Sequence, residues 1–432
     1  MRQNGHLAIV ATARAPIARA AAWLVLAGLG TGFFLQMYAR MARPTGNDLG
    51  ARLASARILV EGGNPYALTL PQGHGPYPLT IDALVVPLTW LPLGLAQSLW
   101  FGLTLGALVG CLLVLDALWR QARSGAMDPV FAVPFEVRLA VLALALFIPF
   151  QNHLRYGQVN LLQLCLTSLF LAFHLRCRGL AAAAALGSAI ALKLTPAVFL
   201  LYLGRGRSYR TALRVIGWTL LLAVGLPALI SPRVLELYRV GWVPELLGLT
   251  SGPVEYEWRT RFTLAAVLTE IWPRLGTVPG LRQAAAAAVL APLLWIQPRL
   301  ARDPRGGLFL FALYTTAMPL LSPVSETHHL AMLAGPLWIW LLAAGSPPYM
   351  PVLDGVGGAL VLSGHWLGVA LAGPAAGREG SLFDGTSLLL LYGLLFVRSL
   401  RMTRVVALPA PDARVSEART VGADGAPRRS HP

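Results

Sequence analysis

Apolar stretches without period-two alternation recur along nearly the whole chain and are separated by short polar segments. Each has about 15 to 24 residues, which lets a helix cross or nearly cross a hydrocarbon core of about 30 Å. Leu-rich and Ala-rich stretches of this kind exclude the alternating strands of an outer-membrane barrel. The pattern predicts an all-α polytopic membrane protein of about 10 to 12 transmembrane helices, in which we place spans at 17–38, 95–118, 136–150, 158–175, 211–230, 281–297, 307–321, 330–345, 355–372 and 386–400.

The composition excludes a soluble protein. Of the 432 residues, 56% are hydrophobic and 12% are charged, and the mean hydropathy is +0.61. A net charge of +16 would indicate nucleic-acid binding in a soluble protein. Here, however, the arginines gather at the ends of apolar stretches and in the tails, where they set topology and contact lipid headgroups. The three cysteines show no CxxC spacing, so neither a disulfide framework nor a zinc site is predicted.

With the N-terminus in the cytoplasm, the Arg-rich loops fall on the cytoplasmic side, as the positive-inside rule requires. We expect a cytoplasmic N-terminus at 1–16 and a transmembrane domain at 17–404. The tail, 405–432, has too few apolar residues to fold and is expected to be disordered in the cytoplasm. The segments predicted to face outside are 42–94, 231–280 and 321–329.

The apolar segment 179–204 is interrupted by Lys193-Leu194-Thr195-Pro196. Proline removes a backbone donor and disfavours helix in the residue before it. A re-entrant hairpin that turns back at Lys193 keeps the basic residues after it on the cytoplasmic side, whereas a full span places them outside. We favour the hairpin. Lys193, the only lysine in the chain, then lies near the floor of a cavity; the alternative is that it snorkels to the inner interface.

The first outer segment, 42–94, begins with a predicted amphipathic helix at the membrane surface, with Leu49, Leu53, Ala56, Leu59 and Val60 at helical spacing. The helix is expected to end at Gly62-Gly63, and Asn64-Pro65-Tyr66 supplies a turn. Asp48 stands at the start of the helix, where a carboxylate makes a good N-cap. The other interpretation is a general base at the bilayer surface.

Three further polar clusters are candidates for substrate contact. Glu326, His328 and His329 lie between two apolar stretches, and imidazole can donate to a leaving phosphate. These residues could equally be interfacial polar groups, and their spacing disfavours a metal site. The segment 150–164 is either a polar hairpin turn or a set of amides for sugar hydroxyls, and its candidates are Gln158 and Asn160. Arg259 and Arg261, in the second large outer segment, suit bidentate phosphate contacts.

The order of several motifs resembles glycosyltransferase family 87, the polyprenyl-phosphate-mannose-dependent α-mannosyltransferases with the GT-C architecture. The resemblance extends from about residue 47 to residue 345. The motifs that carry it are Ala56-Arg57-Ile58-Leu59-Val60-Glu61-Gly62-Gly63-Asn64-Pro65-Tyr66, then Gly157-Gln158-Val159-Asn160, then Ala191-Leu192-Lys193 with Pro196, and finally Ser322-Pro323-Val324-Ser325 followed by His328-His329.

The resemblance implies that Asp48 is the catalytic aspartate of an inverting transfer. Its carboxylate would take the proton of the acceptor hydroxyl while that oxygen attacks the anomeric carbon and a polyprenyl phosphate leaves. No metal or other cofactor is expected, because cationic side chains can take the developing charge. Where many relatives carry an aromatic residue after the Ser-Pro turn, this chain has Glu326. The candidate substrate-binding residues are His328, His329, Lys193, Arg259, Arg261, Gln158, Asn160, Glu326, Asn64 and Tyr66.

The expected function is therefore transfer of a sugar, most simply mannose, from a polyprenyl-phosphate donor to a glycolipid or glycan acceptor. The expected location is the inner (plasma) membrane, with the active site on the extracytoplasmic side and no nucleic-acid partner. The alternatives are an arabinosyltransferase of the same architecture and a transporter or flippase of a lipid-linked substrate. A scaffold without catalysis is a third alternative. A transporter would place polar residues at mid-membrane in several spans, whereas here they gather in the outer segments.

Overall fold

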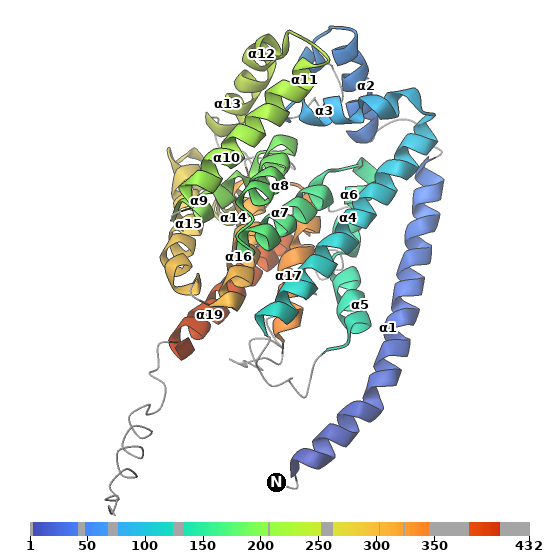
Figure 1. The fold of residues 1–432 in the computed structure, drawn as a ribbon, viewed down its shortest axis with the longest axis vertical. Coiled ribbons are helices and arrows are strands. Elements are labelled where there is room, and N and C mark those ends of the chain that lie inside the picture. Colours follow the sequence, from blue (N-terminus) through green and yellow to red (C-terminus); the bar gives the residue numbers. More distant parts are fainter. Residues whose placement is uncertain are drawn as a thin grey trace, which may run out of the picture.

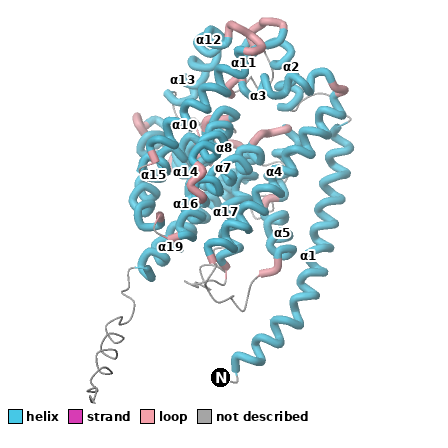
Figure 2. The backbone as a smooth tube through the Cα atoms, viewed as in Figure 1, coloured by secondary structure: helices cyan, strands magenta, loops and turns pink. Residues whose placement is uncertain are grey.

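The chain forms an assembly of helices (Figure 1). The computed structural model describes residues 3–41, 48–67, 77–123, 133–205, 208–251, 262–301, 303–322, 325–344 and 380–406. Within these ranges the regular structure is helical throughout (Figure 2). The long helices are α1 (Gln3–Met41), α4 (Leu93–Ala122), α7 (Asn160–Leu175), α8 (Gly179–Leu192), α10 (Tyr209–Leu220), α15 (Leu281–Leu300), α16 (Pro304–Leu321) and α19 (Gly380–Val406).

Shorter helices connect and cover these. The α-helical ones are α2 (Asp48–Val60), α3 (Thr80–Val85), α5 (Phe135–Ala145), α6 (Phe147–Tyr156), α9 (Phe199–Arg205), α11 (Leu226–Ala228), α12 (Val234–Leu237), α13 (Val243–Ser251), α14 (Leu264–Ile271) and α17 (Ala334–Ala343). The short 3-10 helices are η1 (Pro65–Ala67), η2 (Val86–Trp90), η3 (Thr195–Val198), η6 (Pro273–Thr277) and η7 (Thr327–Leu333), and η4 (Leu221–Gly225) and η5 (Tyr238–Trp242) are π-helical.

Four helical segments among the described residues are long and apolar enough to cross a membrane: Pro16–Leu35, Leu93–Ala122, Tyr209–Ala228 and Thr386–Thr403. A fifth span results if α5 and α6, bent by 68°, are counted together. On α4, leucines such as Leu99, Leu103 and Leu113 are about half exposed, which suits contact with lipid and not with water. The predicted all-α membrane protein is confirmed, and the predicted span at 355–372 lies outside the described residues.

The centre of the molecule is built by α4, α7, α8, α16 and α17. Helix α7 packs against both α4 and α8, and α16 packs against α17 and α19. Their shared interior includes Trp338, Tyr314, Phe170 and Leu115, all with no more than 1% of their surface exposed. This interior supports the loops and short helices in which the polar clusters lie.

Helices α2 and α3 lie at one end of the molecule, and the N-terminus and α19 lie toward the other (Figure 1). Leu49, Leu53 and Ala56 of α2 are at most 4% exposed and pack with Ile81 of α3 and Trp100 of α4. The apolar face of α2 is therefore covered by protein and not by lipid, unlike the predicted surface helix. Val60, expected on that face, is 54% exposed.

The predicted break at Lys193 is confirmed. Helix α8 ends at Leu192, Lys193 has extended backbone angles (φ −164°, ψ 138°), and Pro196 is the second residue of η3. The buried side chain of Gln163, on α7, donates from Nε2 to the carbonyl oxygens of Ala189 (3.1 Å) and Lys193 (3.0 Å). It satisfies backbone acceptors at the interrupted end of the helix. The turning back of the chain after this break stays a prediction.

The segment 150–164 is not a simple polar hairpin. Residues 147–156 form α6, and only Gly157 to Val159 separate it from α7. Gly157 has a positive φ of 68° and ends α6 in the left-handed conformation that glycine adopts without cost. A Cβ at this position would lie 2.6 Å from the Cβ of Leu49, so the turn rests directly on the start of α2.

We expect Gly157→Ala to destabilise the protein by about 1 to 3 kcal/mol, because the methyl group meets Leu49 and the positive φ strains alanine. Thermal unfolding in detergent measures the effect as a lower melting temperature. Gly217→Ala in α10 is the matched control, since nothing lies within 4 Å of its added Cβ. Equal melting temperatures for the two variants would contradict the close packing of Gly157 on α2.

Candidate active site

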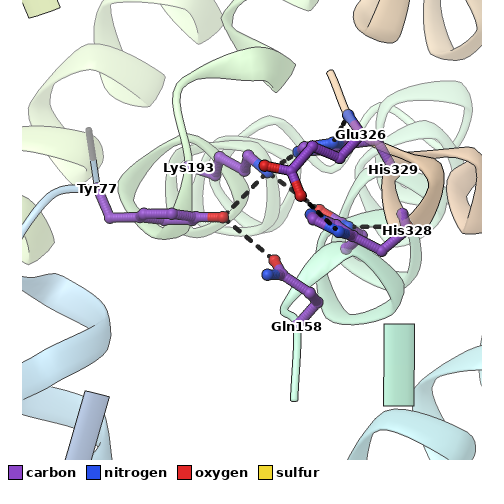
Figure 3. A network of polar contacts seen from close by, with 7 residues as sticks. Tyr77, Gln158, Lys193, Glu326, His328 and His329 are labelled. Carbon is purple, nitrogen blue, oxygen red and sulfur yellow. Dashed lines mark hydrogen bonds and ion pairs between the residues drawn. The ribbon is translucent and has the colours of Figure 1, made fainter. Parts of the chain in front are cut away.

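Lys193 lies at the centre of a network of polar side chains from distant parts of the chain (Figure 3). Its Nζ donates to the hydroxyl of Tyr77 (3.3 Å) and to Oδ1 of Asn160 (3.4 Å), and it contacts Nε2 of His329. The extended backbone at the helix break brings the ammonium group to the N-terminus of α7 and to η7. The ammonium group therefore contacts three parts of the chain that are far apart in sequence: the residue Tyr77, the start of α7 and η7.

His329 is held in one orientation by its own turn. The backbone N–H of Glu326 donates to its Nδ1 at 2.7 Å, so a neutral ring carries its proton on Nε2, the atom that faces Lys193. Burial, and then the charge of Lys193, hold the pKa of His329 well below its usual range. The ring is therefore neutral near pH 7, and Nε2–H and the ammonium group are donors directed at the same place. An anionic oxygen there would accept from both.

His328 lies beside His329, with ring centroids 4.3 Å apart. Its Nδ1 is 3.5 Å from Oε2 of Glu326, and its backbone carbonyl accepts from Nδ2 of Asn160 at 3.0 Å. Burial, and then Lys193, also lower the pKa of His328 well below its usual value. The short helix η7 thus places both histidines in the network, His329 at Lys193 and His328 at Glu326 and Asn160.

Tyr77 connects the network to α2 and α3. Its hydroxyl donates to Oε1 of Gln158 at 3.1 Å, and the guanidinium carbon of Arg52 lies 4.3 Å from the centre of its ring. Arg52 in turn forms an ion pair with Asp82 of α3, with 3.5 Å between Nη1 and Oδ1. The Asp82 side chain has no exposed surface and that of Arg52 is 8% exposed, so this is a buried ion pair.

Asp48 is the first residue of α2, and its side chain lies outside the described part of the structure. Two backbone relations locate the position. Arg52 follows one helical turn later, and residues four apart share a face of a helix. Leu49, the next residue, packs on Gly157, directly before Gln158. The start of α2 is therefore next to the turn that carries Gln158 and Asn160.

Of the residues proposed from the sequence, Lys193, Gln158, Asn160, Glu326, His328 and His329 come together in the one network. Asn64 and Tyr66 do not join it directly. The side chain of Asn64 accepts the backbone N–H of Tyr66 at 3.0 Å, and the Tyr66 hydroxyl donates to the backbone oxygen of Tyr77 at 3.0 Å. They anchor the backbone at Tyr77. Arg259 and Arg261 lie outside the described residues.

Sequence reasoning missed Tyr77, Arg52, Asp82 and Gln163. Tyr77 and Asp82 stand in Gly-Pro-Tyr-Pro-Leu-Thr-Ile-Asp, a stretch in which a charged residue at the start of an apolar segment marks a buried polar contact. Gln163 is likewise a polar residue in an apolar stretch, the Leu-rich start of α7. Arg52 carries no such signal, because an arginine on a surface helix is usually solvated. Among the described residues, no cluster of three or more His, Cys, Asp or Glu side chains could hold a metal ion.

Comparison with known proteins identifies the family. Residues 76–323 match the sequence profile of glycosyltransferase family 87, which covers more than half of the chain. The chain belongs to glycosyltransferase family 87. Lys193 and most of its network partners, from Tyr77 to Gln163, lie within the matched residues, and Glu326, His328 and His329 follow directly after them.

Two similar proteins of this family come from Mycobacterium tuberculosis. The polyprenol-phosphate-mannose-dependent alpha-(1-2)-phosphatidylinositol pentamannoside mannosyltransferase of strain CDC 1551 is 29% identical over 309 residues, which is 69% of this chain and 63% of that protein. The polyprenol-phosphate-mannose-dependent alpha-(1-2)-phosphatidylinositol mannoside mannosyltransferase of strain H37Rv is 30% identical over 321 residues, or 69% of this chain and 67% of that protein. The chain thus spans about two thirds of the length of these relatives.

Among solved structures, the chain is similar to ArnT from Cupriavidus metallidurans. The apo structure matches with a TM-score of 0.32 and 17% identity, covering 89% of this chain and 78% of that one. The structure of ArnT bound to undecaprenyl phosphate matches with a TM-score of 0.33 and 16% identity, covering 88% and 78%.

The buried Arg52–Asp82 pair is expected to be important for stability, since removal of one partner leaves the other charge in a dry environment. We expect Asp82→Leu to lower the free energy of unfolding by about 3 to 5 kcal/mol. The double variant Arg52→Met with Asp82→Leu is expected to be less destabilised than Asp82→Leu alone. Unfolding in mixed micelles that contain an increasing fraction of denaturing detergent measures the free energy of unfolding of both variants.

The exposed pair formed by Arg233 and Glu236 is the control. Glu236→Leu is expected to change the unfolding midpoint little, because both side chains are about half exposed and screened by water. A loss for Asp82→Leu no larger than that for Glu236→Leu would contradict a role of the buried pair in holding α2 on α3.

Proposed function

We propose that this chain transfers a sugar, most simply mannose, from a polyprenyl-phosphate donor to a hydroxyl of a glycolipid or glycan acceptor. Membership of glycosyltransferase family 87 supports the reaction class, and the names of the two mycobacterial relatives support the donor. The single observation that carries the proposal is that two donors, Nζ of Lys193 and Nε2 of His329, lie against each other near the turn that packs on the start of α2.

The donor phosphate is proposed to lie against Lys193 and His329. In the displacement, the bond between the anomeric carbon and the phosphate oxygen breaks, and the electron pair leaves with the polyprenyl phosphate. The ammonium group and the Nε2–H of His329 stabilise that charge, because both are donors in a buried site where charge interactions are strong. These side chains need no resident metal to do so.

Asp48 is proposed as the general base. Its carboxylate takes the proton of the acceptor hydroxyl as that oxygen forms the bond to the anomeric carbon, which inverts the configuration there. The position of Asp48 at the start of α2, one turn before Arg52 and one residue before Leu49, supports this role. Attack from the α2 side and departure toward Lys193 place the two reacting oxygens on opposite sides of the sugar ring.

The proposed location is the inner (plasma) membrane, with the site on the extracytoplasmic side. The Arg-rich loops support this orientation, and α2 and α3 lie at the end of the molecule away from the N-terminus and α19 (Figure 1). A transporter of a lipid-linked substrate is the second candidate, because Lys193 lies at a helix break and transporters bind their substrates at broken helices. The family makes transfer the first choice. The proposed reaction would be the same if the donor sugar were arabinose in place of mannose.

Asp48→Asn tests the proposal, because it keeps the size of the side chain and removes its basicity. We expect transfer of labelled mannose from a polyprenyl-phosphate donor, in membranes with equal amounts of each protein, to fall at least about 100-fold. Asp303→Asn is the matched control. Asp303 caps α16 by accepting the backbone N–H of Arg305, a role that asparagine also fills.

Full transfer activity in Asp48→Asn would overturn the role of Asp48. Absence of transfer from both polyprenyl-phosphate mannose and polyprenyl-phosphate arabinose by the unaltered protein, together with movement of the labelled lipid across the bilayer of proteoliposomes, would favour the transporter.

A further inference from the structure

The hydroxyl of Tyr77 forms two hydrogen bonds, donating in one and accepting in the other. A phenol has one proton to donate, and Oε1 of Gln158, at 3.1 Å, takes it. A lone pair is then left for the donor Nζ of Lys193, at 3.3 Å. The amide of Gln158 therefore orients the hydroxyl so that its acceptor side faces the ammonium group (Figure 3).

The tyrosine ring is itself fixed from the side of α2 and α3. Arg52 lies over it at 4.3 Å, and Arg52 is held in a buried ion pair by Asp82. The hydroxyl of Tyr66 donates to the backbone oxygen of Tyr77, which anchors the main chain at the same residue. Ring and backbone are thus both constrained, so the hydroxyl has little freedom to move.

Lys193, in contrast, carries its charge on a flexible four-carbon chain and begins from an interrupted helix. A flexible cation contributes less to the binding of an anion when it must be ordered during binding. The hydrogen bonds to Tyr77 and Asn160 hold the ammonium group in place before any ligand arrives. Of these two acceptors, Tyr77 is the one that extends the network to the helix that begins with Asp48.

We propose that Tyr77 is a positioning residue, which fixes the Lys193 ammonium group in the donor-phosphate site and ties it to α2. The inference rests on the proposed function only in taking the anion to be the phosphate of a polyprenyl lipid. It assigns no step of the chemistry to Tyr77, which acts through Lys193. It also predicts that the hydroxyl, and not the ring alone, is what the site requires.

The test is a double-mutant cycle on the affinity for undecaprenyl phosphate, measured with the purified protein in nanodiscs and without any sugar transfer. Tyr77→Phe keeps the ring under Arg52 and removes the hydroxyl. We expect its dissociation constant to rise about tenfold, as for loss of a hydrogen bond to a charged group. In a Lys193→Met background the same substitution is expected to change the dissociation constant less than twofold.

Two further variants make the result specific. Gln158→Leu removes the acceptor that orients the hydroxyl and is expected to weaken binding in the same Lys193-dependent way. Tyr392→Phe, on α19, removes a buried tyrosine hydroxyl that donates to the backbone oxygen of Val289 at 2.7 Å, and it is expected to leave the affinity unchanged. In transfer assays Tyr77→Phe should raise the KM for the donor by a larger factor than it lowers kcat.

Equal weakening by Tyr77→Phe in the native and Lys193→Met backgrounds would overturn the inference, since Tyr77 would then act independently of Lys193. Unchanged affinity in Lys193→Met would overturn it as well, because the phosphate would not lie at Lys193. Neither result depends on turnover, so failure of the transfer reaction itself is recognised separately by the Asp48→Asn assay.

Discussion

The site depends on one backbone constraint, the interruption of α8 at Lys193. Where α8 ends, the carbonyl groups of its last residues lose their intrahelical donors and need other partners inside a water-poor bundle. The buried amide of Gln163 donates to the carbonyl of Lys193 and, beside the backbone N–H of Lys193, to that of Ala189. With the backbone stabilised in an extended conformation, the lysine side chain leaves the helix and reaches α7 and η7. An uninterrupted helix would have kept that charge on its own surface.

The second requirement is a rigid connection between the break and the end of the molecule where α2 and α3 lie (Figure 1). Tyr77 provides it on one side, through Arg52 and Asp82, and Gly157 provides it on the other, through its close packing against Leu49. Both connections end on α2, the helix that begins with Asp48. The candidate base and the candidate phosphate site are therefore both held by α2 and by α3, which pairs with α2 through Asp82. Residues 48 and 193 are nevertheless far apart in sequence.

Much of this arrangement could be predicted from local sequence. Pro196 and the isolated Lys193 marked the break, glycines marked the end of α2, and the order of motifs brought Gln158, Asn160, His328 and His329 into one set. The apolar periodicity of α2 was correct, but it could not tell a protein partner from lipid, and it placed exposed Val60 on the buried face. Tyr77, Arg52 and Gln163 were missed because their roles come from tertiary contacts across 25 to 116 positions, which no local pattern records. Helix α6 was missed because its polar side chains resembled a turn.

Lys193 and His329 are proposed to hold a lipid phosphate next to the start of α2. A cryo-electron microscopy structure of the protein in nanodiscs with undecaprenyl phosphate bound would show this directly. We expect phosphate oxygens within hydrogen-bond distance of Nζ of Lys193 and Nε2 of His329, with the Asp48 carboxylate facing the same cavity. Phosphate density held elsewhere, for example by Arg259 and Arg261 with Lys193 still bound to Tyr77, would contradict this proposal.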